Sequence, residues 1–382
     1  MYALMVVPSD FPNGDAGAVR DLAFAKIYQE LGYQVVLIGM GKNASDGTID
    51  GIRFFSLYHN KDSIFQHIIQ YVLYKKRLAA LVCEITQNAG TPGLVHINDI
   101  CGGAINWLIG FCNDNSVPIL HDSTEWYSES EFKYGKWDKA YILKDRLNRK
   151  IIRNPIKVIC ISSYLEDHFK SRGLRTIRVP VIMDVKNASK SLRHPDDDGI
   201  VRLIYAGSPA AKDYLGEIIG AITGLPSSKQ ARLSAHILGI DEDTLMKICH
   251  VKEIPECVKV YGRVPRRQVI EVMRVMDFSL LMRPSGERYA MAGFPTKSVE
   301  AMSHRVAMIC NLTSDLGMYL KDGENAVIAD DCTADSFREA INRVLAMDRD
   351  EIENIKDRAR LLAEDSFDYR IFSNCIKQFI EK

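Results

Sequence analysis

What this sequence lacks excludes several classes of protein. Its 382 residues contain no run of about 18 apolar residues, so no membrane-spanning helix is predicted. Nine cysteines are scattered from Cys83 to Cys375 without a CxxC pair, which argues against a disulfide framework and a zinc site. The apolar N-terminus has no basic segment of the kind that begins a secretory signal. These absences favour the reducing cytoplasm.

The sequence also lacks an excess of charge of one sign. Lys plus Arg and Asp plus Glu both total 49, so no long-range field attracts nucleic acid, and no nucleic-acid partner is expected. The acidic run Asp196–Asp198 is interpreted as a solvated turn, so no metal and no cofactor are expected. With 47% hydrophobic and 26% charged residues, the composition is typical of soluble globular proteins.

Alternation of apolar runs with helical patterns predicts two α/β domains with parallel sheets, since the chain is too long for one core. In the first half we expect strands at 3–7, 35–38, 94–97, 119–120 and 158–161. In the second half we expect strands at 201–206, 235–238, 258–261, 278–282, 306–309 and 326–329. The predicted boundaries are a first domain over 1–185, a linker over 186–195, a second domain over 196–366 and a returning C-terminal helix over 367–382.

The strongest local motif is a strand that ends at Gly207-Ser208-Pro209 and leads through Lys212 into a helix. Such a turn directs helix N–H groups toward an anion, and the Lys212 ammonium is placed to pair with a diphosphate. An ordinary strand-to-helix turn with a solvated lysine is an equal alternative from this motif alone.

A second motif, Ala292 to Met302, reads as a loop that feeds a helix with Pro295 at its first position. The N–H groups of Thr296 and Lys297 then point outward, and the Glu300 carboxylate is placed to accept hydrogen bonds from a ribose diol. The alternative is a surface ion pair between Lys297 and Glu300.

Together these motifs resemble the donor domain of GT-B glycosyltransferases of family 4, also called glycosyl transferases group 1, in the subset with an AGFPTK-type donor loop. The resemblance implies two doubly wound Rossmann-like domains facing a cleft, an acceptor-binding one first and a nucleotide-sugar donor-binding one second. It gives Gly207 and Lys212 to the diphosphate, Lys212 with a catalytic role, and Glu300 to the donor ribose. The turn containing Arg263 and Val264 resembles the one that meets the nucleobase.

Two departures from the family pattern stand out. Ser208 occupies a position where the family often has arginine, and Ala292 stands where the first of two glutamates is expected. We expect Arg283, Ser285 or Lys297 to supply contacts that the absent groups otherwise make. For Arg283, a salt bridge at the edge of the site is an equal alternative.

In the first half, a loop with Gly14, Asp15 and Gly17 follows the first strand and opens a helix. It resembles the family's first glycine loop, which contacts donor phosphate and acceptor, and it lacks the GxGxxG spacing of dinucleotide-binding proteins. Arg20 has two equal interpretations, a phosphate ligand or a residue that solvates the helix.

A polar cluster follows the expected strand at 119–120, at the end where open α/β sheets place their ligands. His121 resembles the histidine that many members place beside the transferred sugar, and a structural histidine is the alternative. Asp122 and Glu125 either orient acceptor hydroxyls or cap the next helix, with capping preferred for Asp122 and acceptor binding for Glu125.

The implied function is transfer of a sugar from a nucleotide diphosphate sugar to a hydroxyl of a saccharide or lipid-linked acceptor, with retention and without metal. The alternatives are a nucleotide-sugar epimerase of the same fold, a non-catalytic nucleotide-sugar binding protein and, disfavoured by the missing fingerprint, a dehydrogenase. Two basic runs, Tyr71–Leu78 and Lys144–Lys157, are either solvated faces or sites of peripheral contact with anionic lipids at the inner face of the membrane.

Overall fold

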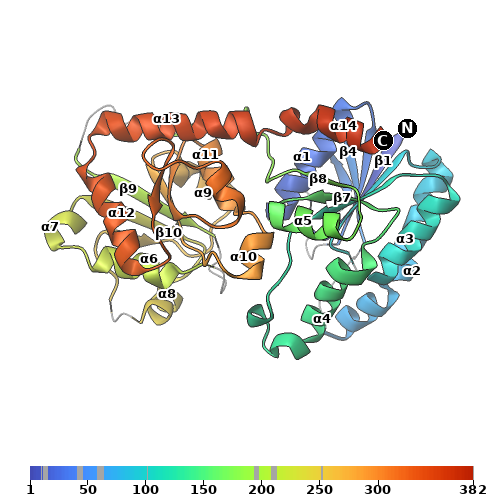
Figure 1. Ribbon diagram of the computed structural model, residues 1–382, viewed down its shortest axis with the longest axis horizontal. Coiled ribbons are helices and arrows are strands. Elements are labelled where there is room, and N and C mark those ends of the chain that lie inside the picture. Colours follow the sequence, from blue (N-terminus) through green and yellow to red (C-terminus); the bar gives the residue numbers. More distant parts are fainter. Residues whose placement is uncertain are drawn as a thin grey trace. The chain divides into compact units, whose positions relative to one another are not determined.

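The computed structural model describes residues 1–9, 11, 16–40, 46–57, 64–100, 102–192, 198–207, 213–250 and 253–381, with the backbone alone over 64–72. The chain forms two compact units (Figure 1). The N-terminal unit comprises Met1–Met183 together with Tyr369–Lys382, and the second unit comprises Asp184–Asp368.

In its described part, the N-terminal unit contains an eight-stranded sheet of order β3-β4-β2-β1-β5-β6-β7-β8, parallel except for the β3–β4 pair. Its strands are β1 (Tyr2–Val7), β2 (Gln34–Gly39), β3 (Gly47–Ile49), β4 (Ile52–Ser56), β5 (Leu94–Asn98), β6 (Ile119–Ser123), β7 (Lys157–Cys160) and β8 (Thr176–Arg178). Every residue of β1 and β5 is buried, as expected for central parallel strands covered on both faces.

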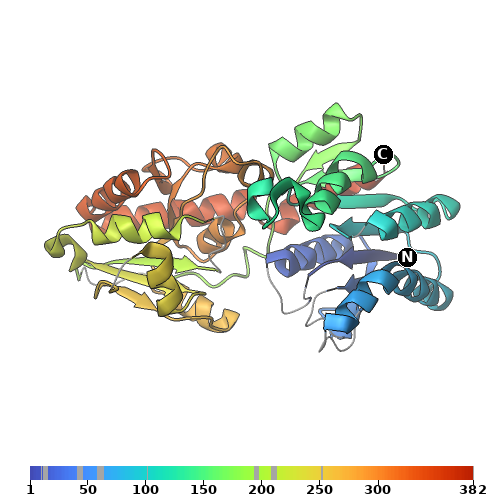
Figure 2. The same cartoon turned by 90° about the horizontal axis from the view of Figure 1, so that it is seen from below.

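Helices cover both faces of this sheet (Figure 2). They are α1 (Ala16–Glu30), α2 (Ile64–Ala89), α3 (Gly102–Asp114), η1 (Glu129–Glu131), η2 (Gly135–Trp137), α4 (Lys139–Arg146), the π-helical turn η3 (Leu147–Ile151), α5 (Ser163–Ser171), η5 (Tyr369–Phe372) and α14 (Ser373–Glu381). Gly32, at φ +87°, ends the first helical segment in the left-handed conformation that favours glycine.

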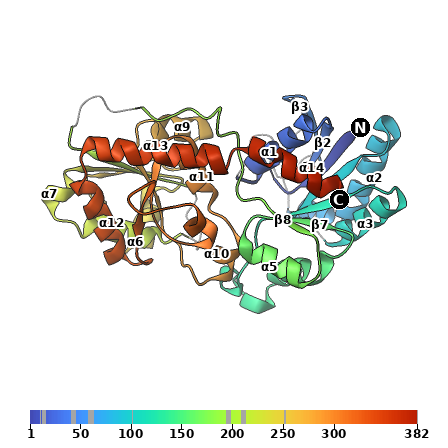
Figure 3. The same ribbon diagram turned by 45° about the horizontal axis from the view of Figure 1, so that its top comes forward.

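The C-terminal segment completes the core of the N-terminal unit. Ile376, Phe379 and Ile380 of α14 belong to the same buried cluster as Phe24 and Ile27 of α1. The two helices lie side by side (Figure 3). The apolar stripe of this amphipathic tail therefore packs against the first helix of the chain.

The second unit contains a parallel sheet of order β11-β10-β9-β12-β13-β14. Its strands are β9 (Val201–Ala206), β10 (Leu233–Leu238), β11 (Val258–Val260), β12 (Phe278–Leu281), β13 (Ala307–Asn311) and β14 (Ala326–Ala329). Its helices are α6 (Leu215–Thr223), α7 (Ser227–Gln230), α8 (Glu242–Cys249), α9 (Arg266–Met273), α10 (Arg288–Ala292), α11 (Thr296–Ser303), η4 (Ser314–Met318), α12 (Ala334–Ala346) and α13 (Arg349–Ser366).

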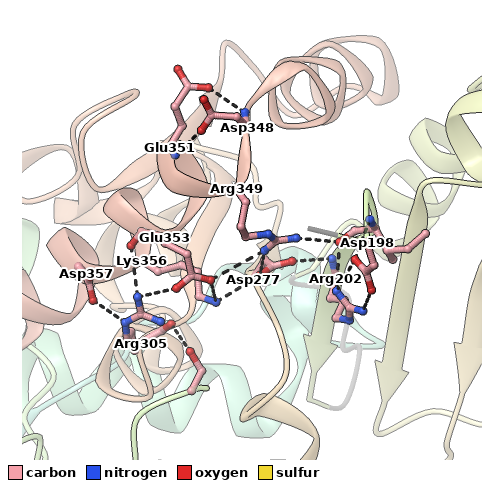
Figure 4. Close-up of polar contacts among 12 residues, drawn as sticks. Asp198, Arg202, Asp277, Arg305, Asp348, Arg349, Glu351, Glu353, Lys356 and Asp357 are labelled. Atoms are coloured by element: carbon pink, nitrogen blue, oxygen red, sulfur yellow. Dashed lines mark hydrogen bonds and ion pairs between the residues drawn. The ribbon is translucent and has the colours of Figure 1, made fainter. Parts of the chain in front are cut away.

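A buried ionic network holds α13 at the amino ends of β9 and β12 (Figure 4). Lys356, fully buried, donates to Asp277 at 3.2 Å and to Glu353 at 3.0 Å. Arg305 donates to Glu353 at 2.6 Å, and Arg349 donates to Asp277 at 2.8 Å. Removing one member of such a network leaves its partners charged and buried, which is costly.

The predicted strands of both halves are present, most of them shifted or extended by one to three residues. Strands β3, β4 and β8 were not predicted. The predicted linker includes Ser191, which belongs to the second unit, is buried there and donates to the carbonyl of Arg305 at 2.7 Å.

Candidate functional site

Candidate site residues gather at the switch point of the second sheet. From β9 the strands continue through β10 to β11 on one side, and β12 to β14 lie on the other. Ligands of open α/β sheets bind beyond the carboxyl ends of the two strands that flank such a point. Gly207 follows β9 and Arg283 follows β12, so both occupy this position.

Gly207 is required by its conformation and by its neighbour. Its φ of +147° is one that side chains rarely adopt, and a Cβ there would lie 3.2 Å from Nζ of Lys297. A bare backbone at this point therefore lets the lysine of α11 approach the end of β9.

Three charged side chains meet beside Gly207. Arg283 donates through Nε to Asp213 Oδ1 at 2.5 Å, and Lys297 donates to Asp213 Oδ2. The hydroxyl of Tyr205 also donates to Asp213 Oδ2 at 2.8 Å, and the Lys297 ammonium lies 4.1 Å from the centre of the Tyr205 ring. One carboxylate is thus shared by two cations, which leaves one positive charge in excess.

The electrostatics of this cluster keep the Asp213 carboxyl ionised near neutral pH. Burial acts to raise the pKa of the Asp213 carboxyl, but the Lys297 and Arg283 charges outweigh burial and lower the pKa to about 2. Burial lowers the pKa of Lys297, an effect that Asp213 opposes.

The loop before α11 is anchored by packing. Phe294 lies edge-on to Tyr319 and Phe367, with ring centroids 5.9 and 5.7 Å apart. Ser298 Oγ donates to the carbonyl of Pro295 at 2.6 Å within the first turn. Pro295 is the N-cap rather than the first helical residue, so the predicted helix start was early by one residue. Thr296 and Lys297 open the helix, where N–H groups lack partners within the helix.

Glu300 lies one turn further along α11 and accepts a hydrogen bond from Arg266 at 2.7 Å. The alternative ion pair between Lys297 and Glu300 was wrong, because Lys297 pairs with Asp213. Arg263 and Val264 follow a turn in which Gly262 has φ +67°. Arg263 is exposed and Val264 is half-buried.

In the N-terminal unit, His121 is buried at 1% exposure on β6, and burial lowers the pKa of its imidazole to about 4. Its Nδ1 has no hydrogen-bond partner among the described residues. The imidazole lies edge-on to Phe169, with ring centroids 6.5 Å apart. His121 is therefore neutral at physiological pH.

The predictions for Arg20 and Asp122 were wrong. Arg20 is buried at 4% exposure and donates to both oxygens of Asp122, at 2.7 and 2.8 Å, as well as to the carbonyls of Val179 and Pro180. It neither solvates α1 nor extends toward a ligand, and Asp122 caps no helix. The pair joins α1, β6 and the segment after β8.

Glu125 is exposed near the carboxyl end of β6. Burial, followed by the charge of Glu125 and a hydrogen bond with it, raises the pKa of the neighbouring Tyr127 hydroxyl well above its usual range. Lys144 of α4 forms an ion pair with Asp99 and lies 5.0 Å from the centre of the Tyr127 ring. These polar groups lie beside the switch point between β1 and β5.

Four of the predicted site residues, Gly14, Asp15, Ser208 and Lys212, lie outside the described residues. Gly17 is the second residue of α1. Asp213 and Tyr205 were missed by the sequence analysis. An aspartate just before a helix looks like an ordinary cap, and only the fold brings Lys297 and Arg283 to it.

Within the ranges that the structure describes, no group of three or more His, Cys, Asp or Glu side chains is arranged to hold a metal ion. No described helix is long and apolar enough to cross a membrane. The eight cysteines of the described ranges are unpaired.

Residues 184–362 match the family model described as glycosyl transferases group 1. This range covers most of the second unit. No curated protein sequence matches the chain.

Solved structures with similar folds cover nearly the whole chain. A sucrose-phosphate synthase from Thermosynechococcus elongatus has a TM-score of 0.73 at 13% identity, covering 100% of this chain and 98% of that chain. WaaG, a glycosyltransferase involved in lipopolysaccharide biosynthesis, has a TM-score of 0.70 at 13% identity, with 99% of each chain covered. HepE of Anabaena, in complex with UDP and glucose, has a TM-score of 0.68 at 14% identity, with 100% of each chain covered. The chain therefore has the GT-B fold of glycosyltransferases, with two Rossmann-like α/β units.

Proposed function

We propose that this protein is a family 4 glycosyltransferase that moves a sugar from a nucleotide diphosphate sugar to a hydroxyl of a saccharide or lipid-linked acceptor. The observation that carries the proposal is the pair of cations, Lys297 and Arg283, beside the bare backbone of Gly207 at the switch point of the second sheet. Two cations and a helix N-terminus attract a diphosphate. The family match of residues 184–362 supports a nucleotide-sugar donor in this unit.

In this proposal the diphosphate lies against Gly207, Lys297, Arg283 and the N-terminus of α11 at Thr296. Ser208 and Lys212 extend the same site through the sequence resemblance. The first departure from the family pattern bears on this arrangement. The arginine expected at Ser208 is missing, and Arg283 and Lys297 approach from β12 and α11 instead.

The remainder of the donor contacts a different part of α11 and its neighbours. We assign Glu300 to the ribose hydroxyls, since its carboxylate is one turn from Lys297 and forms its ion pair, within the described ranges, with the half-exposed side chain of Arg266. The turn at Arg263 and Val264 contacts the nucleobase. Release of Glu300 from Arg266 on donor binding is part of this assignment.

The N-terminal unit is proposed to bind the acceptor. Glu125, exposed at the end of β6, orients an acceptor hydroxyl, and Asp15 is assigned to the acceptor as well. Gly14 and Gly17 are assigned to the donor phosphate through the sequence resemblance. His121 is assigned to the transferred sugar; its unpartnered Nδ1 and neutral imidazole support a hydrogen bond with a hydroxyl.

The proposed reaction retains the anomeric configuration and uses no metal. The bond from the anomeric carbon to the diphosphate oxygen breaks, charge builds on the diphosphate, and Lys212, Lys297 and Arg283 stabilise that charge. The acceptor oxygen forms the new bond, and its proton passes to the leaving phosphate. The reaction is placed in the cytoplasm, in agreement with the scattered cysteines.

The test is a thermal-shift screen of UDP, GDP and ADP and their sugar conjugates, because a ligand that binds the folded state raises its stability. One nucleotide is expected to stabilise the protein, and Lys297→Met is expected to abolish that shift. Lys321→Met is the matched control, since the Lys321 side chain is 70% exposed in the same unit. Absence of any shift across the panel would contradict the donor assignment.

With the stabilising donor in hand, product analysis decides the reaction. Transfer to a saccharide or lipid-linked acceptor, unaffected by a chelator and with the anomeric configuration retained in the NMR spectrum, is expected. An altered nucleotide sugar released without acceptor would indicate an epimerase instead. Tight donor binding without turnover in an acceptor panel would indicate a binding protein.

A further inference from the structure

One surface of the N-terminal unit exposes several apolar side chains. In η2, α4 and the residue before η2, the side chains of Tyr134, Trp137, Ile142 and Leu143 are 64%, 77%, 45% and 51% exposed. Only two other large apolar side chains of this unit, Met1 and Ile371, are exposed to this degree among those that the structure describes. Scattered single apolar residues are normal on a surface, but four within ten residues mark an interaction site.

The helical part of this surface has a regular geometry. Lys139, Ile142, Leu143 and Arg146 are spaced as i, i+3, i+4 and i+7, so they share one face of α4. Figure 1 shows α4 at the periphery of the N-terminal unit. Basic side chains flank the two aliphatic ones along this face.

The opposite face of the segment is fixed to the unit. Trp126 Nε1 donates to Asp145 at 2.9 Å, and Lys144 pairs with Asp99. Leu147, in the π-helical turn that continues α4, is buried. The exposed face therefore belongs to a helix held in place by its other side.

The same segment carries a local excess of positive charge. Residues 133–153 contain eight basic and two acidic side chains, although the whole chain is neutral. Seven of the basic side chains are exposed: Lys133, Lys136, Lys139, Arg146, Arg149, Lys150 and Arg153. Lys133 and Lys136 lie 5.4 and 5.6 Å from the ring centres of Tyr134 and Trp137.

We propose that this surface, the η2–α4 surface, docks the protein on a bilayer that contains anionic lipids. Trp and Tyr favour the headgroup region, aliphatic side chains insert below it, and Lys and Arg pair with lipid phosphates. A sugar polymer would use the aromatic rings but would gain little from exposed Ile142 and Leu143. The inference stands on this surface alone and agrees with a lipid-linked acceptor for the proposed transferase.

The basic run Tyr71–Leu78 does not offer an equivalent surface. Its side chains Tyr74 and Leu78 are buried at 3% and 0% exposure, so the apolar face of this stretch of α2 packs inside the unit. Lys75, Lys76 and Arg77 are exposed, and no apolar side chain is exposed among residues 73–78, the part of the run whose side chains the structure describes. They provide a matched control of equal charge on the same unit.

The experiment measures binding to vesicles of phosphatidylcholine with and without phosphatidylglycerol, by flotation of the full chain. Wild-type protein is expected to bind only the anionic vesicles, and less as salt rises, since salt screens exposed charges. The triple variant Lys136→Gln, Lys139→Gln, Arg146→Gln is expected to bind about 100-fold more weakly, or about fivefold for each charge. Trp137→Ser with Leu143→Ser is expected to reduce binding about 10-fold or more even at low salt.

The control Lys75→Gln, Lys76→Gln, Arg77→Gln is expected to stay within about threefold of wild type, since these charges lie off the docking surface. An equal loss in this control would overturn the assignment to the η2–α4 surface. Failure of the wild-type protein to bind anionic vesicles would overturn the proposal, as would binding to soluble sulfated dextran in preference to vesicles, or dimerisation through this surface in gel filtration. Nucleotide thermal shifts of the same variants are expected to be unchanged, so a failed donor assignment and a failed docking surface give different results.

Discussion

Replacing Asp213 by asparagine tests the electrostatic description of the site most directly. The substitution keeps the size of the side chain and one of its two acceptor oxygens, and it removes the charge that Lys297 and Arg283 share. The other oxygen becomes an NH2 group, which cannot accept a hydrogen bond. Two neighbouring cations, whose side chains are only 16% and 18% exposed, then lack their counterion. We expect the second unit to lose stability and its attraction for a diphosphate to increase.

The size of the expected stability loss follows from the lowered pKa of the Asp213 carboxyl. Its pKa falls from 3.8 to about 2 in the folded protein. At 1.36 kcal/mol for each pKa unit, the ionised carboxylate contributes about 2 kcal/mol to folding. Because the pKa is lowered, this contribution is present above about pH 4 and is lost as the pH falls toward about 2. Asp213→Asn is therefore expected to cost about 2 kcal/mol at neutral pH.

The assay can assign the loss to one unit, because Trp107, Trp126 and Trp137 all lie in the N-terminal unit. Circular dichroism follows both units during urea unfolding, whereas tryptophan fluorescence follows only the first. Asp213→Asn is expected to shift the dichroism transition and leave the fluorescence transition in place. The matched control Asp335→Asn, at an ion pair whose aspartate is 87% exposed, is expected to stay within about 0.5 kcal/mol of wild type.

Nucleotide binding provides the second readout. A diphosphate supplies the negative charge that the variant lacks, so its affinity is expected to rise by up to about 30-fold, the equivalent of about 2 kcal/mol. A variant as stable as wild type would refute the stability argument. Weaker nucleotide binding by the folded variant would show that the cations depend on Asp213 for their position, and the charge argument would be wrong.

Four further results are expected. Lys212→Ala should lower turnover about 100-fold without a change in melting temperature, and an unchanged rate would place the phosphates elsewhere. Glu300→Ala should weaken donor binding about 10-fold or more, measured by calorimetry against Arg266→Ala, which removes only its partner and should not weaken it. His121→Ala should reduce the rate of sugar transfer more than it reduces donor affinity. Because burial lowers the pKa of His121 to about 4, the wild-type rate should show no change from this group between about pH 6 and 8. An inflection in that range assigned to His121 would contradict its neutral state. Lys356→Met should lower the free energy of urea unfolding by about 3 kcal/mol or more, because it leaves the charges of Asp277 and Glu353 buried without this partner. Donor affinity should be unchanged, since the network lies at the amino ends of the strands. A loss of stability under about 1 kcal/mol would contradict the structural role of Lys356.

The pattern of apolar runs was sufficient for the long central strands. Strand β1 is buried along its whole length and β9 at four of its six positions, which leaves a nearly continuous apolar signal in the sequence. Strands β3 and β8 are three residues each and contain no fully buried residue, so their sequences show no more of a strand pattern than a loop does. Strand β4 alternates buried and exposed positions over only five residues.

The sequence predicted the candidate site only where its residues lie in motifs that resemble a known family. Gly207, Lys297 and Arg283 were selected because their motifs resemble a family, and the structure brings them together. Arg20 and Asp122 were misinterpreted because their bond joins residues 102 positions apart. A basic residue at the start of a helix looks solvated until its partner across the fold is known.

The proposed role of Asp213 follows from the loss of fold stability that two cations cause when they are held close together before an anion binds. An anion site whose cations are already positioned stabilises charge without reorganisation, but a buried cation without a counterion destabilises the fold. Arg283 lies two residues after β12 and Lys297 lies on α11, so both belong to elements other than the segment between β9 and α6, where the family often has its arginine. Sharing one carboxylate compensates one of the two charges and leaves the other in excess. An acidic residue within the proposed anion site is therefore consistent with the proposed function, because it permits two cations to converge where the arginine of the family pattern is missing.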